Sequence, residues 1–400
     1  MTTPPVRLGI IGLGAMGARV LQIASTHPEY DVVAAADLNP STVSQYAEHH
    51  PSIRFTTTPT EVIAADVDAV YIATPPATHA DLTEAAFTAG HAVFCEKPLS
   101  ISLADGRRML AAATTSGRAA AVNFALSDRR ATLYLEEVLR SGLERSLPGR
   151  LAAGAGTGEG EAPAVGLGVG EGEARAVGLG VGEGEARAVG LGVGEGEARA
   201  VGLGVGEGEA RAIGVGTGEG EAPAVGLGVG EVRAVEIRLA FPVWPRAFQA
   251  SAGWLGERPQ GGFVREVFSH FAYLTDRLIG PLVPVDLHLE HRGPGSEVAA
   301  FGLYRAADVP VQVSGVVAGP TTYEWIVRGS QRSYLLRDWQ HLFVAEGKDW
   351  ESVELPGEQG GEETRLSLFA EAVRGNHPAN LADFATAYRV QRAVEAWHTA

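Results

Sequence analysis

The sequence predicts an α/β fold: a doubly wound parallel sheet at the amino terminus, then an α+β domain with a largely antiparallel sheet. Two observations predict the first domain. Apolar runs of strand length alternate with helix-forming segments as far as residue 124, and the first run leads into glycines spaced G-x-G-x-x-G. Short runs of alternating apolar and polar residues after residue 231 predict the second domain, because they are typical of half-exposed strands.

The glycine motif lies between an expected strand starting at Val6 and a helix-forming run. Gly12 permits a tight turn, Gly14 lets the backbone approach a pyrophosphate, and Gly17 lets the helix pack against the strand. The helix then presents free N–H groups and its positive dipole end to the phosphates. The motif therefore predicts a dinucleotide-binding domain of the Rossmann type.

An acidic residue follows the second expected strand and predicts which dinucleotide is bound. This residue, Asp37, stands twenty positions after Gly17, where a carboxylate accepts the ribose hydroxyls of adenosine. The next three residues, at 38–40, include no Arg or Lys that would accommodate a 2′-phosphate. We therefore expect NAD as the cofactor, with NADP the less favoured alternative.

Apolar and glycine-terminated segments define the other elements of the first domain. The continuous apolar run at 68–73 is typical of a buried parallel strand, and Gly90 and Gly117 are expected to end helices. The expected elements are helices at 40–49, 61–65, 79–89 and 103–115, and strands at 53–55, 68–73, 92–95 and 119–124.

Length and composition limit the class of protein. A chain of 400 residues suggests two domains, and 45% hydrophobic residues supply a sizeable core. A formal net charge of −16 argues against a nucleic-acid partner, and a single cysteine, Cys95, excludes an internal disulfide. Apolar runs are too short to span a bilayer, nothing resembles a signal peptide, and the histidines lack metal-ligand spacing. We expect a cytoplasmic protein without a metal, a membrane or a nucleic acid as partner.

A glycine-rich repeat of twelve residues interrupts the chain at 151–230. The unit Ala-Val-Gly-Leu-Gly-Val-Gly-Glu-Gly-Glu-Ala-Arg occurs without change at 164–175, 176–187, 188–199 and 200–211, and the region holds 27 of the 52 glycines. Ordering so many glycines is entropically costly, so a weakly ordered insertion is expected. The strict alternation of small and larger residues leaves strands or hairpins as the alternative.

The second domain is expected to combine strands, a central helix and two closing helices. The loop after its first strand carries Trp244 and Arg246, which we regard as candidates for binding a polar ligand. In the central helix, Glu266 and His270 are four positions apart and so lie on one face. The expected strands are 232–241, 297–304, 310–317, 323–327 and 333–336, and the expected helices are 261–280, 366–373 and 383–397.

Three separate motifs together resemble the glucose–fructose oxidoreductase, inositol dehydrogenase and MocA family. They are Gly-Leu-Gly-Ala-Met-Gly at 12–17, Ala-Thr-Pro at 73–75 followed by His79, and Glu-Lys-Pro-Leu at 96–99. The resemblance covers residues 6–150 and 231–400. It divides the chain into a Rossmann domain (1–124), a connecting helix (125–150), the repeat (151–230) and a substrate and oligomerisation domain (231–400) with closing helices at 366–400.

The resemblance implies where cofactor and substrate bind. Lys97 is expected to lie near the nicotinamide and the reacting oxygen, with Glu96 beside it and a Lys97–Pro98 bond that is cis. The family pattern has an acid, a glycine and a histidine along one helix, where this chain has Glu266, Phe268 and His270. The implied cofactor-binding residues are Gly12, Gly14, Ala15, Met16, Gly17, Asp37, Ala73, Thr74, Pro75, His79, Glu96, Lys97 and Asn123. The candidate substrate-binding residues are Lys97, Trp244, Arg246, Arg265 and His270.

These residues predict hydride transfer between NAD and a secondary alcohol or ketone of a sugar, a polyol or a similar small polar molecule. His270 is expected to take the hydroxyl proton, with Lys97 holding the oxygen or itself carrying the proton. Glu266 is expected to orient His270 or to bind a substrate hydroxyl. Two alternatives remain open: a dinucleotide-binding sensor without catalysis, and an assembly role for the repeat. The family also implies a homo-oligomer that forms through the second sheet.

Overall fold

The computed structural model describes part of the chain and divides it into two compact units, residues 1–137 with 232–400 and residues 138–231. The described residues are 4–146, 228–249 and 252–399, with repeat strands at 155–157, 165–169, 174–175, 177–181, 186–187, 190–193 and 204–205. Each unit is considered by itself. The division falls inside α6 (Arg130–Ser146), in the segment expected to connect the two domains.

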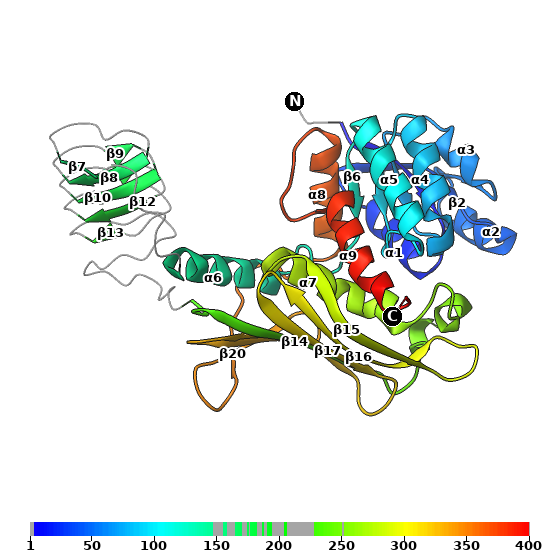
Figure 1. The fold of residues 1–400 in the computed structure, drawn as a ribbon. Helices are drawn as coiled ribbons and strands as arrows, with labels where there is room; N and C mark the ends of the chain where they lie inside the picture. The colour runs from blue at the N-terminus through cyan, green and yellow to red at the C-terminus, as the bar shows by residue number, and fades with distance from the viewer. Residues whose placement is uncertain are drawn as a thin grey trace. The chain divides into compact units, whose positions relative to one another are not determined.

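A parallel sheet forms the amino-terminal half of the first unit, as Figure 1 shows. In chain order its elements are β1 (Val6–Ile11), α1 (Ala15–Ala24), β2 (Tyr30–Ala36), α2 (Pro40–His49), β3 (Arg54–Thr56), α3 (Pro59–Ile63), β4 (Ala69–Ile72), η1 (Pro76–Thr78), α4 (His79–Thr88), β5 (Ala92–Cys95), α5 (Leu103–Ser116) and β6 (Ala120–Val122). The strand order is β6-β5-β4-β1-β2-β3, so the order reverses between β1 and β4. The predicted doubly wound sheet is confirmed.

The sequence explains these elements locally. β4 and β5 are apolar along their whole length and fully buried, as strands covered on both faces must be. In α5, the side chain of Ser102 accepts the N–H groups of Ala104 and Asp105, and the helix ends at Gly117, whose φ is +62°.

The second sheet is largely antiparallel, with the order β15-β16-β17-β14-β18-β19-β20-β21 and one parallel pair, β14 with β17. Its elements, with the helices that follow or interrupt it, are β14 (Val232–Ala240), η2 (Ala247–Gln249), η3 (Gly253–Gly256), the π-helix η4 (Val264–Phe268), α7 (Ser269–Leu278), β15 (Leu282–His291), β16 (Glu297–Ala306), β17 (Val309–Val316), β18 (Thr322–Gly329), β19 (Ser333–Arg337), β20 (His341–Ala345), β21 (Glu351–Ser352), α8 (Glu362–Val373), β22 (Ala382–Asp383) and α9 (Phe384–Ala396). The predicted α+β class is confirmed.

Two helices cover one face of this sheet. The indole N–H of Trp325 on β18 donates to the Thr275 hydroxyl of α7 over 2.9 Å, and the Tyr304 hydroxyl of β16 donates to the Ala393 carbonyl of α9 over 2.7 Å. Both aromatic side chains are fully buried. On β16 the side chains of Phe301 and Leu303 remain exposed on the other face.

The end of the chain returns to the first sheet. β22 pairs antiparallel with β6, and α8 places Leu366, Phe369 and Ala370 in the core of the parallel sheet. The ring of Phe369 stacks on that of Phe94, with centroids 4.8 Å apart. The sequence-based division assigned this segment to the second domain, whereas the apolar face of α8 packs on the first.

The second unit contains parallel strands from the repeat. β7 (Ala155–Thr157), β8 (Val165–Val169), β10 (Val177–Val181), β12 (Gly190–Val193) and β13 (Gly204–Val205) form one sheet, and β9 (Ala174–Arg175) and β11 (Ala186–Arg187) form another. Paired residues are twelve positions apart, so each copy pairs with the same position of the next. These strands agree with the strand alternative, although they are parallel and not hairpins. Apart from residues 228–230, the rest of the repeat lies outside the described residues.

Phe369→Ala is expected to lower the free energy of unfolding of the first unit by about 3–5 kcal/mol, because it leaves a cavity beneath the parallel sheet. Phe248→Ala, at a side chain that is 70% exposed, serves as the control and should cost less than about 1 kcal/mol. Denaturant unfolding measures both. Equal losses in the two variants would contradict the packing of α8 on this sheet.

Candidate functional site

The carboxyl ends of the parallel strands gather the predicted cofactor residues. β1, β4, β5 and β6 end next to one another at the edge where the strand order reverses. Ligands of open α/β sheets bind at this kind of switch point. The loops that follow these strands contain the glycine motif, the Ala73–Pro75 turn, the Glu96–Pro98 turn and Asn123.

The glycine loop has the shape that a dinucleotide needs. Gly12 has a φ of +93°, and a Cβ there would lie 2.6 Å from the carbonyl oxygen of Ala73. A Cβ on Gly17 would lie 1.8 Å from the Gly12 carbonyl oxygen, whereas a Cβ on Gly14 would meet nothing within 4 Å. Gly14 is also the N-cap of α1 and has no side chain to bond the free N–H groups. Open space at this helix end fits a pyrophosphate.

Asp37 is fixed at the end of β2 by backbone groups on both sides. One carboxylate oxygen accepts the Leu13 N–H over 2.8 Å, and the other accepts the Asn39 N–H over 2.9 Å. Each oxygen keeps a lone pair for a further donor. This end of the sheet therefore fits an adenosine ribose.

The other cofactor candidates in the glycine loop differ in exposure: Ala15 is exposed and Met16 is half-buried.

His79 lies behind the site and joins two of its turns. One ring nitrogen is 2.9 Å from the Thr74 carbonyl oxygen, and the other is 3.1 and 3.2 Å from those of Pro98 and Leu99. The side chain is fully buried, and burial lowers its pKa. His79, expected to bind the cofactor, therefore holds in place the loops that would bind it.

Glu96 is buried in a polar cluster of its own. It accepts hydrogen bonds from the Tyr71 hydroxyl and, over 2.8 Å, from the Asn123 side-chain amide. Burial raises the pKa of this carboxyl group. Two predicted cofactor residues, Glu96 and Asn123, thus fix each other beside Lys97, in a network that includes Tyr71.

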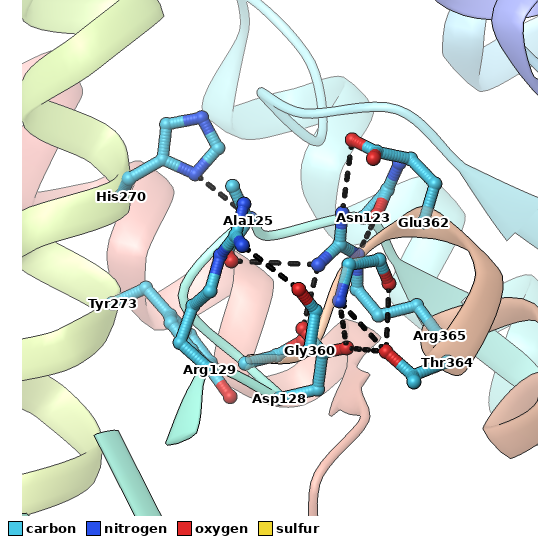
Figure 2. A network of polar contacts seen from close by, with 12 residues as sticks. Asn123, Ala125, Asp128, Arg129, His270, Tyr273, Gly360, Glu362, Thr364 and Arg365 are labelled. Atoms are coloured by element: carbon cyan, nitrogen blue, oxygen red, sulfur yellow. Dashed lines mark hydrogen bonds and ion pairs between the residues drawn. The ribbon is translucent and has the colours of Figure 1, made fainter. Parts of the chain in front are cut away.

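Arg365 of α8 extends this network beneath the site (Figure 2). Its guanidinium donates to the Asn123 side-chain oxygen over 2.7 Å and to the Asp128 carboxylate over 2.6 Å, and it lies 3.1 Å from Glu362. The side chain is 1% exposed. Because a buried guanidinium is tolerated only when it is fully paired, Arg365 fixes the loop after β6 in one arrangement.

Lys97 and Glu266 form a largely buried ion pair between the two sheets. The Lys97 Nζ donates to the Glu266 carboxylate and, over 3.0 Å, to the backbone carbonyl of the same residue. The side chains of Lys97 and Glu266 are 9% and 15% exposed. The Lys97–Pro98 peptide bond is cis, as expected.

The Glu266 carboxylate has two further donors from the loop after β14. Gln249 Nε2 donates to its second oxygen over 2.8 Å, and the Arg246 guanidinium does so over 3.2 Å. Arg246 also lies over the rings of Trp244 and Phe248. The candidate Arg246 therefore reaches the site, whereas Trp244 supports it and donates its indole N–H to the Leu255 carbonyl.

The π-helix η4 directs its side chains differently from the expected regular helix. Phe268 packs in the core, with its ring 5.9 Å from those of Tyr304 and Trp397. Arg265 is buried and forms a two-pronged pair with Glu395, at 2.8 and 2.7 Å. The proposed substrate role of Arg265 is therefore not supported by its position. Phe268 does not obstruct the site.

His270 lies one turn beyond Glu266 but does not bond to it in the described structure. The backbone N–H of Ala125 donates to His270 Nδ1 over 3.2 Å (Figure 2), so the proton of the neutral ring lies on Nε2. Burial, and then the positive charges of Lys97 and Arg365, lower the pKa of His270 well below 6.5. The expectation that Glu266 orients His270 is wrong: the backbone of the β6 loop does so.

Sequence reasoning missed several residues around this pair. Gln249, Tyr323 and Arg365 have no motif of their own and come from distant segments. Trp339, at the turn between β19 and β20, packs its ring edge-on against His270, with centroids 5.2 Å apart. Its one sequence signal was an Asp-Trp pair at a turn position where glycine or asparagine is usual.

Comparisons with known proteins agree with this geometry. Residues 6–124 match the model of an oxidoreductase family with an NAD-binding Rossmann fold. Inositol 2-dehydrogenase 2 from Paenarthrobacter aurescens is 41% identical over 110 residues, which cover 27% of this chain and 32% of that protein. The chain thus matches about a third of the length of this relative.

Solved structures resemble the whole chain in fold. A 3-ketoreductase from Actinomadura kijaniata, solved with NADP and TDP-benzene, aligns with a TM-score of 0.67 and 17% identity over 99% of this chain and 97% of its own. UDP-N-acetylglucosamine 3-dehydrogenase from Acidithiobacillus ferrooxidans aligns with a TM-score of 0.65 and 16% identity, over 99% and 98%. At such identities the likeness establishes the fold.

Within the described residues, no group of three or more His, Cys, Asp or Glu side chains is arranged to hold a metal ion. None of their helices combines the length and the apolar character needed to cross a membrane.

Acidification is expected to destabilise the fold through its buried histidines. Burial lowers the pKa of both His79 and His270, so below about pH 6.5 the unfolded chain binds protons that the folded chain excludes. The free energy of unfolding should fall as the pH falls, by up to about 1.4 kcal/mol per pH unit for each histidine. Denaturant unfolding at pH 7, 6 and 5 measures this slope. His79→Gln should reduce it, and an unchanged slope in this variant would contradict the assignment.

Proposed function

We propose that the chain is an NAD-dependent dehydrogenase or reductase, because residues 6–124 match the model of an oxidoreductase family with an NAD-binding Rossmann fold. It would transfer a hydride between nicotinamide and a secondary alcohol or ketone of a sugar, a polyol or a related polar molecule. The observation that carries the proposal is the pairing of Lys97 with Glu266 beside His270, at the switch-point edge of the sheet.

The cofactor would be held by backbone and side-chain groups that fit it. The N-terminus of α1 at Gly14 would bind the pyrophosphate, and Asp37 would accept the ribose hydroxyls. When bound, the nicotinamide supplies or accepts the hydride. NAD is preferred to NADP in this proposal, because Leu38 and Asn39 follow Asp37 without a cation for a 2′-phosphate.

Lys97 and His270 would manage charge and protons at the reacting oxygen. The ammonium of Lys97 and the Nε2–H of neutral His270 are both donors, which is the arrangement that a carbonyl oxygen needs as it gains negative charge. Lys97 would give the proton in reduction and take it back in oxidation. Its carboxylate partner, Glu266, is held by Arg246 and Gln249 and would keep the ammonium in place.

This assignment revises the role first expected for His270. To act as a base at Nδ1, the ring would have to give up the hydrogen bond from Ala125. A neutral imidazole that donates from Nε2 needs no such change. Oxidation would therefore depend on Lys97 as the proton acceptor, with His270 orienting the substrate oxygen.

A homo-oligomer is proposed through the uncovered face of the second sheet. Phe301 and Leu303 on β16 and Val283 and Val285 on β15 are exposed, which is unusual for so many large apolar side chains in one region.

The sensor alternative depended on the Glu266 and Phe268 substitutions. Phe268 is part of the core and Glu266 pairs with Lys97, so no observation favours that alternative.

Asp37→Ala is expected to weaken NADH binding about tenfold or more, because a charged acceptor of ribose hydroxyls is lost. Calorimetric titration with NADH and with NADPH measures the effect. Asp31→Ala, at an exposed position on β2, the strand that precedes Asp37, is the matched control and should bind as the wild type does. Failure of the wild type to bind either nucleotide would contradict the cofactor proposal.

Lys97→Ala is expected to lower kcat at least about a hundredfold, since it removes the donor at the reacting oxygen, while NADH binding persists. The chain has one other lysine, the exposed Lys348, so Lys348→Ala is the control. Steady-state turnover over a panel of sugars and polyols measures both. Unchanged turnover in Lys97→Ala would remove Lys97 from the chemistry.

A further inference from the structure

The turn between β19 and β20 has an unusual backbone. Asp338 and Trp339 both have positive φ, at +50° and +69°. Aspartate tolerates this left-handed region, but a bulky residue such as tryptophan is an outlier there, and glycine would adopt it freely. Non-glycine residues in such conformations cost of order 1–3 kcal/mol and cluster at ligand sites.

The tryptophan is held in this conformation by contacts with the site. Its ring centroid lies 5.2 Å from that of His270, 5.1 Å from that of Phe271 and 5.4 Å from that of Tyr323. The Asp338 N–H donates to the Tyr323 carbonyl over 3.0 Å, which fixes the turn against β18. The turn therefore places the ring of Trp339, from the second sheet, against His270.

Trp339 is not a core residue. Trp325 and Trp397 are fully buried, whereas Trp339 is half-buried and packs its ring edge-on against that of His270. Within the described residues its indole N–H donates no hydrogen bond, in contrast to those of Trp244 and Trp325. An aromatic surface with a free N–H, next to two donors for the reacting oxygen, is suited to a ligand that has both an apolar face and hydroxyls.

We infer that the substrate ring packs on Trp339, which is thus a platform that selects cyclic over open-chain polyols. This inference rests on the proposed function. Pyranoses and cyclitols present a flat face of C–H groups that packs on an indole, whereas an open-chain polyol has no such face. The substrate ring would lie against Trp339 with its reacting carbon directed toward Lys97 and His270. The indole N–H would donate to a ring hydroxyl.

The experiment compares Trp339→Phe, Trp339→Ala and Trp339→Gly with wild type on two sets of probes. The cyclic set is myo-inositol, D-glucose, D-galactose and D-glucuronate, and the open-chain set is sorbitol, mannitol and xylitol, each with NAD. Trp339→Ala should raise KM for the preferred cyclic probe about tenfold, with kcat changed less and open-chain turnover unchanged. Trp339→Phe should keep most of the selectivity.

Controls separate this role from a merely structural one. Trp339→Gly should unfold at a higher temperature than Trp339→Ala, because both lose the ring but only glycine relieves the positive φ, yet it should lose selectivity as Trp339→Ala does. Trp350→Ala, at a half-buried tryptophan packed under Arg328 of the same sheet, should change neither KM nor selectivity.

The outcomes are distinguishable. Wild-type turnover of a cyclic probe with an unchanged KM in Trp339→Ala overturns the platform and leaves the proposed function standing. A wild type that binds NADH but neither oxidises nor binds any probe, by calorimetry on the NADH complex, overturns the proposed function and the platform with it.

Discussion

The ion pair between Lys97 and Glu266 joins the two halves of the site. Lys97 follows a strand of the parallel sheet, and Glu266 lies on the π-helix beside the second sheet, so neither domain alone contains the site. Two charges this far removed from water are costly unless they are paired. Glu266 meets that demand with bonds to Lys97, Arg246 and Gln249. Correct docking of the two sheets is therefore the condition under which the pair of Lys97 and Glu266 forms.

The hydrogen-bond network of Arg365 fixes the site from the side of the first sheet. Arg365 arrives from the last part of the chain, yet it fixes Asn123 and Asp128 at the end of the sixth strand. The loop they belong to provides the Ala125 N–H that sets the tautomer of His270. The tautomer of His270 is thus set by backbone geometry, which in turn depends on a guanidinium buried beneath the first sheet.

Much of the fold was predictable because it depends on local patterns. The strands at 92–95 and 297–304 are indicated by apolar or alternating runs, and the spacing of the glycines at 12–17 indicates the tight turn between the first strand and its helix. The repeat gave no such guide, because its alternation suits several arrangements of strands. The return of α8 to the parallel sheet was also hidden, since Leu366 and Phe369 reveal an apolar face but not the surface it covers.

The candidate site was predictable where a motif fixes the chemistry and not where packing fixes it. Lys97, Glu266, His270 and Arg246 were identified and come together, but Gln249 and Ala125, which bond to them, were not. A hydrogen bond from Ala125, or a ring contact from Trp339 on another sheet, leaves no mark on spacing along the chain. Arg265 was misassigned because its charge is visible in the sequence, whereas Glu395, which neutralises it, lies 130 positions away.

The pairing of repeat strands at an offset of twelve residues has a genetic consequence. Val177 pairs with Val165 and Leu191 with Leu179, so equivalent positions stack on one another. Unequal recombination or replication slippage between identical copies adds or removes whole units and preserves both the reading frame and the strand register. The length of this segment can therefore change in steps of one twelve-residue unit, which extends both repeat sheets, without any substitution in the first unit.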